Sequence, residues 1–347
     1  MDVLFFTEWN GIAHLLFVEM AIIGLAVFLD LLFGEPPLKV HPVVWMGALI
    51  DKLGKFFSTS VPEKQRMRGV FLALTCIFFV AVPVFFLSIL MWRYLDIWSY
   101  IVVSAFLLKA TFAVRCLREH VYTVRDCLYE GDIEGARGIL PGLVGRDPSK
   151  LGEREIISAT IESTAESTVD SFTSPIFYYV LFGLLGAYVY RMINTLDSMV
   201  GHKTEEYVRY GWFSAKIDEL VNYLPSRITS IFIVLSAFLS GYDWRKSWGI
   251  LRRDRYSLES RVGGWSMAPM AGALGVQLEK PEFYTLGDPK EEMAVEHITR
   301  AWRVTFVTII LFFVMVVPII LLLMDLFDLY FYTHLFSPLS DEPLWLF

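Results

Sequence analysis

Residues 70–92 read VFLALTCIFFVAVPVFFLSILMW, an uncharged run that is long enough to cross a bilayer as a helix. Such a run is typical of a membrane span, because a soluble core would mix its apolar residues with polar ones. Apolar runs of similar length occupy residues 11–33, 97–114 and 302–324. Of the 347 residues, 55% are hydrophobic and 16% are aromatic. The sequence therefore predicts an all-α, polytopic integral membrane protein, whose first expected partner is the lipid bilayer.

Two further apolar runs, residues 175–193 and 224–241, are shorter or interrupted by Gly and Pro. Each can be a full span, a tilted span or a re-entrant segment. The sequence therefore predicts a helical bundle of four to six transmembrane helices, with helical loops on the cytosolic side. We find no internal repeat and no separable soluble domain, so residues 1–347 are expected to form a single membrane domain.

Lys and Arg gather in residues 34–69, 115–154 and 242–301, whereas the first ten residues and everything after Arg303 contain none. Because cytosolic loops are enriched in bases, we expect a multi-pass protein of the cytoplasmic membrane, with these three segments inside and both termini outside. The moderately basic segment 194–222 lies outside if both flanking runs cross the bilayer, and inside if both are re-entrant. No nucleic-acid partner is expected.

An acidic stripe precedes one of the interrupted apolar runs, in EREIISATIESTAESTVDSFTSP (residues 153–175). Its members are Glu155, Glu162, Glu166 and Asp170. At about 100° per residue these acids share an arc of roughly 80° on a helix that we expect to begin near Ser149. The next base after Arg154 is Arg191, so the carboxylates repel one another unless a cation such as Mg²⁺ or a distant base reaches them. A solvated helix face is the alternative, but the near absence of Lys favours a functional stripe.

Other polar residues stand beside apolar runs at helical spacing. Asn194 and Asp197 are three residues apart at the end of one run, where the alternative is an interfacial helix cap. Asp218 and Asn222 are four residues apart and should share a helix face, with Arg227 shortly after them. An Asp/Asn pair can hold a cation and Arg can bind phosphate, although an interfacial anchor would also use Arg.

The string Asp30-Leu-Leu-Phe-Gly-Glu-Pro-Pro, followed by His41-Pro42-Val43, resembles the opening of the adenosylcobinamide-phosphate synthase (CobD/CbiB) family. Five later segments resemble that family's motifs in the same order. They read VGRDPSKL (144–151), IESTAESTVDSFTSPIFYY (161–179), YRMINTLDSMVGHK (190–203), KIDELVNYLPSRIT (216–229) and MAGALGVQL (270–278). The resemblance covers residues from about 25 to 320. Residues 257–264, SLESRVGG, depart from it, because the family usually carries a His- and Pro-Asn-Ala-Gly-like stretch there.

The resemblance implies an enzyme of cobalamin (vitamin B12) biosynthesis. It would be an ATP-dependent carbon-nitrogen ligase that uses ATP and Mg²⁺ to join adenosylcobyric acid to (R)-1-amino-2-propanol or its O-phosphate, giving adenosylcobinamide or its phosphate. The active site is expected on the cytosolic side, and association with other membrane enzymes of the corrinoid pathway is expected as well. A transporter and a non-enzymatic sensor or regulator of the AmpE type are the alternative readings.

The resemblance also assigns roles to residues in the matched motifs. The expected catalytic residues are Glu162, Glu166, Asp170 and Asp197, of which the first three are also the expected Mg²⁺ ligands. The expected substrate- and nucleotide-binding residues are Arg146, Arg191, Asn194, Asp218, Asn222, Arg227 and His41, the last in a secondary role. The Arg side chains would bind phosphate groups, and one carboxylate could deprotonate the attacking ammonium.

Overall fold

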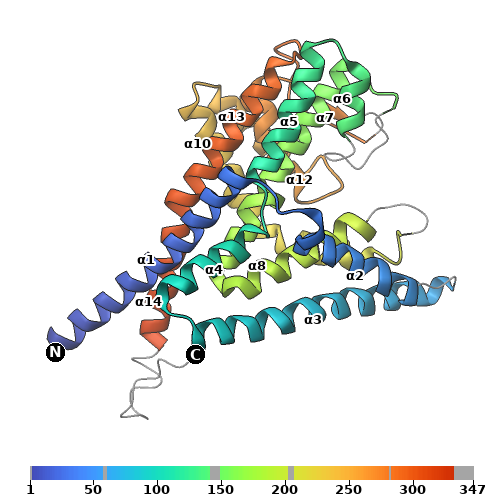
Figure 1. Cartoon of the computed structure of the whole chain (residues 1–347). Coiled ribbons are helices and arrows are strands. Elements are labelled where there is room, and N and C mark those ends of the chain that lie inside the picture. Colours follow the sequence, from blue (N-terminus) through green and yellow to red (C-terminus); the bar gives the residue numbers. More distant parts are fainter. Residues whose placement is uncertain (1, 58–60, 141–148, 202–206, 281–282, 332–347) are drawn as a thin grey trace.

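The computed structural model describes residues 2–57, 61–140, 149–201, 207–280 and 283–331, with side chains between residues 16 and 324. Its described residues are mostly helical (Figure 1), which confirms the all-α prediction. The first half comprises α1 (Asp2–Phe33), η1 (Leu38–Val40), α2 (Pro42–Phe57), α3 (Pro62–Tyr94), α4 (Ile97–Lys109), α5 (Val114–Tyr129), α6 (Ile133–Ile139) and α7 (Glu153–Thr168). The second half comprises the π-helix η3 (Val169–Thr173), α8 (Ser174–Val200), α9 (Trp212–Val221), α10 (Tyr223–Leu239), α11 (Trp244–Asp254), α12 (Gly263–Leu274), β1 (Leu278–Lys280), β2 (Tyr284–Leu286), α13 (Glu296–Leu311), the π-helix η4 (Phe312–Val316) and α14 (Val317–Phe331).

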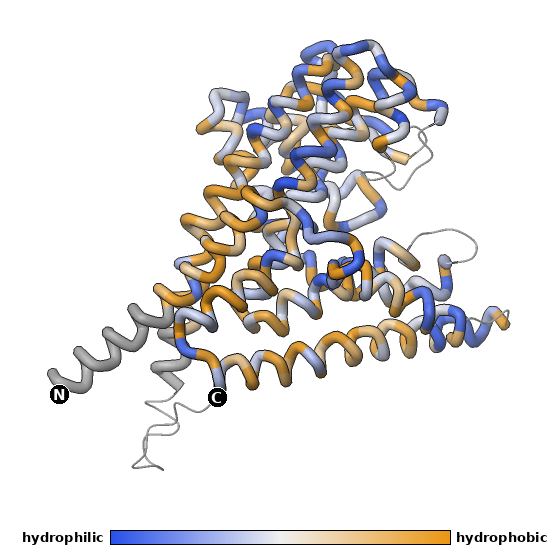
Figure 2. Tube along the Cα trace, viewed as in Figure 1, coloured by the Kyte–Doolittle hydropathy of each residue, from blue (hydrophilic) through white to orange (hydrophobic). Residues whose placement is uncertain are grey.

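The spans predicted from the sequence are present as helices. Within the described residues, five helical segments are long and apolar enough to cross a bilayer by length and composition alone, one of them being Glu153–Val200, which contains α7 and α8. Helices α9 and α10, bent by 50°, would together make a sixth. The protein is therefore a multi-pass membrane protein of the predicted kind. Apolar residues line α1, α3 and the α13–α14 rod, whereas hydrophilic residues gather at the far end, around α5 and α6 (Figure 2). The orientation of the protein in the membrane, with both termini outside, stays a prediction.

Helix α8 is a helical hairpin, although it reads as one long apolar run. The backbone leaves helical geometry at Phe182 and Gly183. The Tyr190 hydroxyl then lies 3.5 Å from the carbonyl oxygen of Asp170, and the rings of Tyr178 and Tyr190 stack 5.5 Å apart. In a straight helix, residues 170 and 190 would be about 30 Å apart. The chain therefore turns back at Gly183, and of the three alternatives for residues 175–193 the structure supports the re-entrant form.

The turn of this hairpin depends on the conformation of Gly183, at φ 62° and ψ −154°. This region of backbone space is accessible almost only to glycine. We expect Gly183→Ala to cost about 1–3 kcal/mol of folding free energy and to lower the apparent Tm in detergent by several degrees. Gly54→Ala is the matched control, because Gly54 lies inside α2 and an added Cβ would meet no atom within 4 Å. Equal melting of the two variants would contradict the hairpin.

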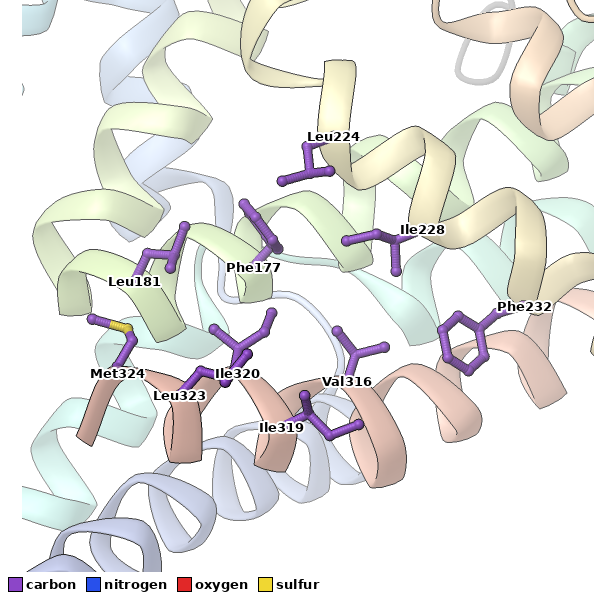
Figure 3. A pocket seen from close by; sticks show the side chains of 10 residues that line it. All are labelled: Phe177, Leu181, Leu224, Ile228, Phe232, Val316, Ile319, Ile320, Leu323 and Met324. Atoms are coloured by element: carbon purple, nitrogen blue, oxygen red, sulfur yellow. The ribbon is translucent and has the colours of Figure 1, made fainter. Parts of the chain in front are cut away.

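The tip of the hairpin is apolar and faces the lipid-exposed helices. Phe177 and Leu181 line a cavity of about 550 Å³, together with Leu224 of α10 and Ile320 of α14 (Figure 3). Aliphatic, aromatic and Met side chains make up its whole lining. The hairpin therefore presents an apolar surface to α14, while its base carries the polar residues described below.

Hydroxyl groups join the helices that surround the hairpin base. The Thr168 hydroxyl of α7 forms a hydrogen bond with the Thr305 hydroxyl of α13 (3.0 Å). The Ser236 hydroxyl of α10 forms one with the Thr308 hydroxyl, also of α13 (2.8 Å). Thr173 of η3 bonds to Thr229 of α10 at 2.8 Å. Small hydroxyl residues let helices approach closely. Their hydrogen bonds help helices associate inside a membrane, where the hydrophobic effect does not draw helices together. They hold α7, α10 and α13 around the start of α8.

Two local predictions need correction. The acidic helix begins at Glu153 with Gly152 as its cap, and not near Ser149, because the Glu155 carboxylate accepts a hydrogen bond from the Gly152 N–H. Glu155 therefore serves the helix terminus. The sequence also suggests one helix over residues 108–130, continuing from the span at 97–114, but this helix is interrupted. Helix α4 ends at Lys109 and α5 begins at Val114, where the Asp30 carboxylate accepts hydrogen bonds from two backbone N–H groups.

Candidate functional site

The acids of α7 differ in how tightly the protein holds them. Glu162 is buried, and its carboxylate accepts hydrogen bonds from the hydroxyl groups of Ser158 and Tyr284, each at 2.7 Å. Glu166 lies one turn further along and is exposed. Its Oε1 points toward the start of α12, where a methyl group on Gly263 would lie 3.5 Å away. Glu166 is therefore open to a ligand, whereas Glu162 is fixed in the wall behind it.

Asp170 follows on the π-helix η3, which adds an extra residue to the helical turn and is often found at functional sites. The carboxylates of Asp170, Asp197 and Asp218 are close enough to Glu166 to repel it or one another. The opposing charges that act on these acids include Arg191 and Lys280. The structure thus brings the acids of three motifs into one region, where their negative charges act on one another.

A second group of polar side chains is buried at the base of the hairpin. Asn222 is fully buried, and its Oδ1 accepts hydrogen bonds from the hydroxyl groups of Ser174 (2.6 Å) and Tyr190 (3.0 Å). Its Nδ2 donates to Asp218 Oδ2 at 3.0 Å, and the other Asp218 oxygen accepts from Asn194 at 3.4 Å. The predicted pairing of Asp218 with Asn222 on one helix face is confirmed. We call Asn194, Asp218 and Asn222 with these two hydroxyl groups the hairpin network.

Arg191 connects this network to the acids. Its Nη1 donates to Asn194 Oδ1 (3.4 Å) and to the Asp170 carbonyl oxygen (3.5 Å). Its Nε is buried and has no hydrogen-bond partner among the described residues. A guanidinium held at the edge of an acidic region is suited to binding an anionic group such as a phosphate.

Arg227 packs against two aromatic rings. Its guanidinium carbon sits 3.3 Å from the ring centre of Tyr223 and 4.3 Å from that of Trp265. Arg255 follows on the same indole ring at 5.5 Å. We call this alternation of Arg227, Trp265 and Arg255 the cation–aromatic stack. Sequence reasoning missed Trp265 and Arg255, whose only signal was a run of basic and aromatic residues after α11.

Among the described contacts, His41 touches none of the acids of α7 and η3. Its Nε2 is 2.5 Å from Glu35, whose carboxylate is 3.8 Å from the buried ammonium group of Lys109. Its Nδ1 accepts a hydrogen bond from the Val43 N–H. The motif around residues 30–43 therefore joins α1 to α4 and α5, and Lys109 is a buried base that sequence reasoning did not single out. Arg146 falls at 141–148, outside the described residues.

The expected Mg²⁺ ligands do not form a closed metal site. Within the described ranges, no three His, Cys, Asp or Glu side chains meet at metal-binding distance. Mg²⁺ usually takes one or two protein carboxylates and completes its shell with water and nucleotide phosphates. The open carboxylate of Glu166 and the neighbouring Asp170 suit that mode, so the assignment of Mg²⁺ to this region stays a prediction.

The comparisons with known proteins agree on one family. The family described as CobD/CbiB protein matches residues 23–330. The chain is 42% identical over 294 residues to the probable cobalamin biosynthesis protein CobD of Methanothermobacter thermautotrophicus, covering 85% of this chain and 95% of that protein. It is 35% identical over 302 residues to the protein of the same name from Thermoplasma volcanium, covering 87% and 97%.

A bacterial relative shows the same pattern. The cobalamin biosynthesis protein CobD of Leptospira interrogans is 37% identical over 300 residues, covering 84% of this chain and 95% of that protein. No solved structure matches the chain. The family match covers the apolar helices, the acids of α7 and the hairpin network. The chain therefore belongs to the CobD/CbiB family of cobalamin biosynthesis proteins.

Proposed function

We propose that this protein is an ATP-dependent ligase that forms an amide between the free carboxylate of adenosylcobyric acid and aminopropanol or its O-phosphate. Membership of the cobalamin biosynthesis family supports the pathway. The observation that supports the chemistry is that Glu166, Asp170 and Asp197 lie near enough for their charges to interact, with Arg191 acting on Asp170 and Glu166 open to a ligand. These groups would lie on the cytosolic side, where ATP is available.

The reaction needs an activated carboxylate, because a carboxylate anion is a poor electrophile. In the proposed sequence, a carboxylate oxygen of the corrinoid attacks the γ-phosphorus of ATP, and ADP leaves. The amine nitrogen then attacks the acyl carbon, the bond from that carbon to the phosphate oxygen breaks, and inorganic phosphate leaves. Aminopropanol arrives as an ammonium, which first gives one proton to a carboxylate of the protein, and the second proton leaves the nitrogen with the departing phosphate.

The residues divide between these two steps. Glu166 and Asp170 would hold Mg²⁺, which neutralises charge on the transferring phosphoryl group. Arg191 would bind a phosphate oxygen through its guanidinium group. Asp197 would accept the proton from the amine. Glu162, held by Ser158 and Tyr284, would keep α7 in place and add to the negative potential.

The direct test is a reconstituted assay. Purified protein in nanodiscs is given adenosylcobyric acid, aminopropanol phosphate, ATP and Mg²⁺, and corrinoid amide and ADP are measured together. We expect equal amounts of amide and ADP, with neither formed when the corrinoid is omitted. A protein that binds the corrinoid yet forms no amide in several lipid compositions would contradict the proposal.

A further inference from the structure

Helix α11 has two faces of very different character. Ser247, Ile250, Leu251 and Asp254 are buried and pack the helix against the protein. On the opposite side, Trp244 and Trp248 are 40% and 44% exposed. Two exposed indoles one turn apart are costly in water and typical of a membrane interface.

Two arginines continue this exposed face. At about 100° per residue, Trp244, Trp248, Arg252 and Arg245 follow one another within an arc of roughly 100° that contains no acid. The nearby acids are engaged elsewhere, because Asp243 pairs with Lys246 at 3.0 Å and Asp254 pairs with Arg253 at 2.6 Å. In the part of the chain that the structure describes, Arg245 and Arg252 form no ion pair with an acid.

The surrounding contacts place α11 where a span ends. Ser236 in the last turns of α10 bonds to Thr308 of α13 at 2.8 Å, so the end of α10 lies beside the segment where α13 passes from basic to apolar sequence. Figure 1 shows α10 and α13 next to each other in that region. Phe238 and Leu239 are exposed there, and the Phe238 ring packs edge-to-face on Trp244. An apolar surface thus continues from the end of α10 onto α11.

We propose that α11 lies in the headgroup layer of the bilayer and binds the phosphate groups of anionic lipids through Arg245 and Arg252. Trp244 and Trp248 enter the boundary between headgroups and acyl chains, where an indole can bury its ring and keep its N–H hydrated. A helix with bases beside exposed tryptophans fits this location, since both the apolar area and the charge favour it. The occupant is a membrane lipid, and the proposal does not depend on the ligase activity.

Lipid retention separates this surface from a free phosphate site. The full chain is taken from nanodiscs of phosphatidylcholine with phosphatidylglycerol, and the lipids that stay bound are counted by native mass spectrometry. We expect R245Q/R252Q to retain at least about fivefold less phosphatidylglycerol, since one base near an anionic surface contributes about that factor. The control K150Q/R154Q removes two exposed bases beside α7 and should retain the wild-type amount. Equal retention by both variants, or displacement of the lipid by millimolar inorganic phosphate, would overturn the proposal.

The depth of α11 is tested by fluorescence quenching in nanodiscs that contain lipids brominated near the top of the acyl chain. The chain has 10 Trp residues, so the signal of interest is the difference between the wild type and W244F/W248F. We expect the quenched part of the emission to fall markedly in that variant. An unchanged quenched fraction would show that neither indole reaches the lipid and would overturn the proposal.

Discussion

Glu166→Gln is expected to abolish amide formation, with turnover reduced at least about 100-fold. The substitution keeps the shape of the side chain and removes its charge. Because Glu166 is exposed beside Asp170 and Asp197, its carboxylate is the one on α7 best placed to hold a nucleotide-bound cation. ADP release should therefore be lost together with the amide. The measurement is the release of ADP and of corrinoid product by the reconstituted protein.

Asp197→Asn should block the attack of the amine and not the transfer of phosphate, if it removes only the proton acceptor. An amine that is uncharged at neutral pH, such as hydroxylamine, needs no deprotonation before it attacks. We therefore expect this variant to form a corrinoid hydroxamate from hydroxylamine while losing activity with aminopropanol phosphate. Glu153→Gln, at the exposed start of α7, is the charge-matched control and should keep normal turnover. Near-normal turnover of both site variants would remove these acids from the mechanism.

Asn222→Leu is expected to have the largest effect on folding. It removes one acceptor and one donor that together satisfy Ser174, Tyr190 and Asp218 in a buried setting. Each buried polar group that loses its partner costs about 1–3 kcal/mol, so we expect a loss of about 3 kcal/mol or more. The base of the hairpin and the bend between α9 and α10 should loosen together, and both the apparent Tm and the turnover should fall.

A graded series tests this explanation. Tyr190→Phe deletes the 3.0 Å hydrogen bond to Asn222 and the longer 3.5 Å contact with the Asp170 carbonyl oxygen, and it should cost about 1 kcal/mol. In the double variant with Asn222→Leu, the loss of the Tyr190 hydroxyl should cost less than it does alone, because the shorter of its two hydrogen bonds is already gone. Additive losses in the double variant would contradict the network as the source of the stability.

Local spacing predicted part of the site correctly. Asp218 and Asn222 are four residues apart on one helix, and helical geometry alone places them together. The acids of α7 share one face for the same reason. What spacing could not distinguish was their use, since Glu155 caps the helix and Glu162 is tied to Tyr284 of β2, far away in the sequence.

The features that the sequence could not predict depend on contacts between distant segments of the chain. The turn at Gly183 sits inside an apolar run, where a glycine indicates close packing as readily as a reversal of the chain. The position of Arg227 depends on Trp265, which comes from another helix. The pairing of His41 with Glu35 is local, yet the neighbouring Lys109 arrives from the end of α4. No periodicity in the sequence encodes these approaches.

The fate of one oxygen atom tests the central claim, ATP-driven activation of the corrinoid carboxylate, most directly. Adenosylcobyric acid labelled with ¹⁸O in its free carboxylate is converted by the reconstituted wild-type protein in the presence of ATP, Mg²⁺ and aminopropanol phosphate. The claim predicts that each amide formed leaves one ¹⁸O in inorganic phosphate and one in the amide carbonyl. Unlabelled phosphate, or amide formation without ATP consumption, would contradict it.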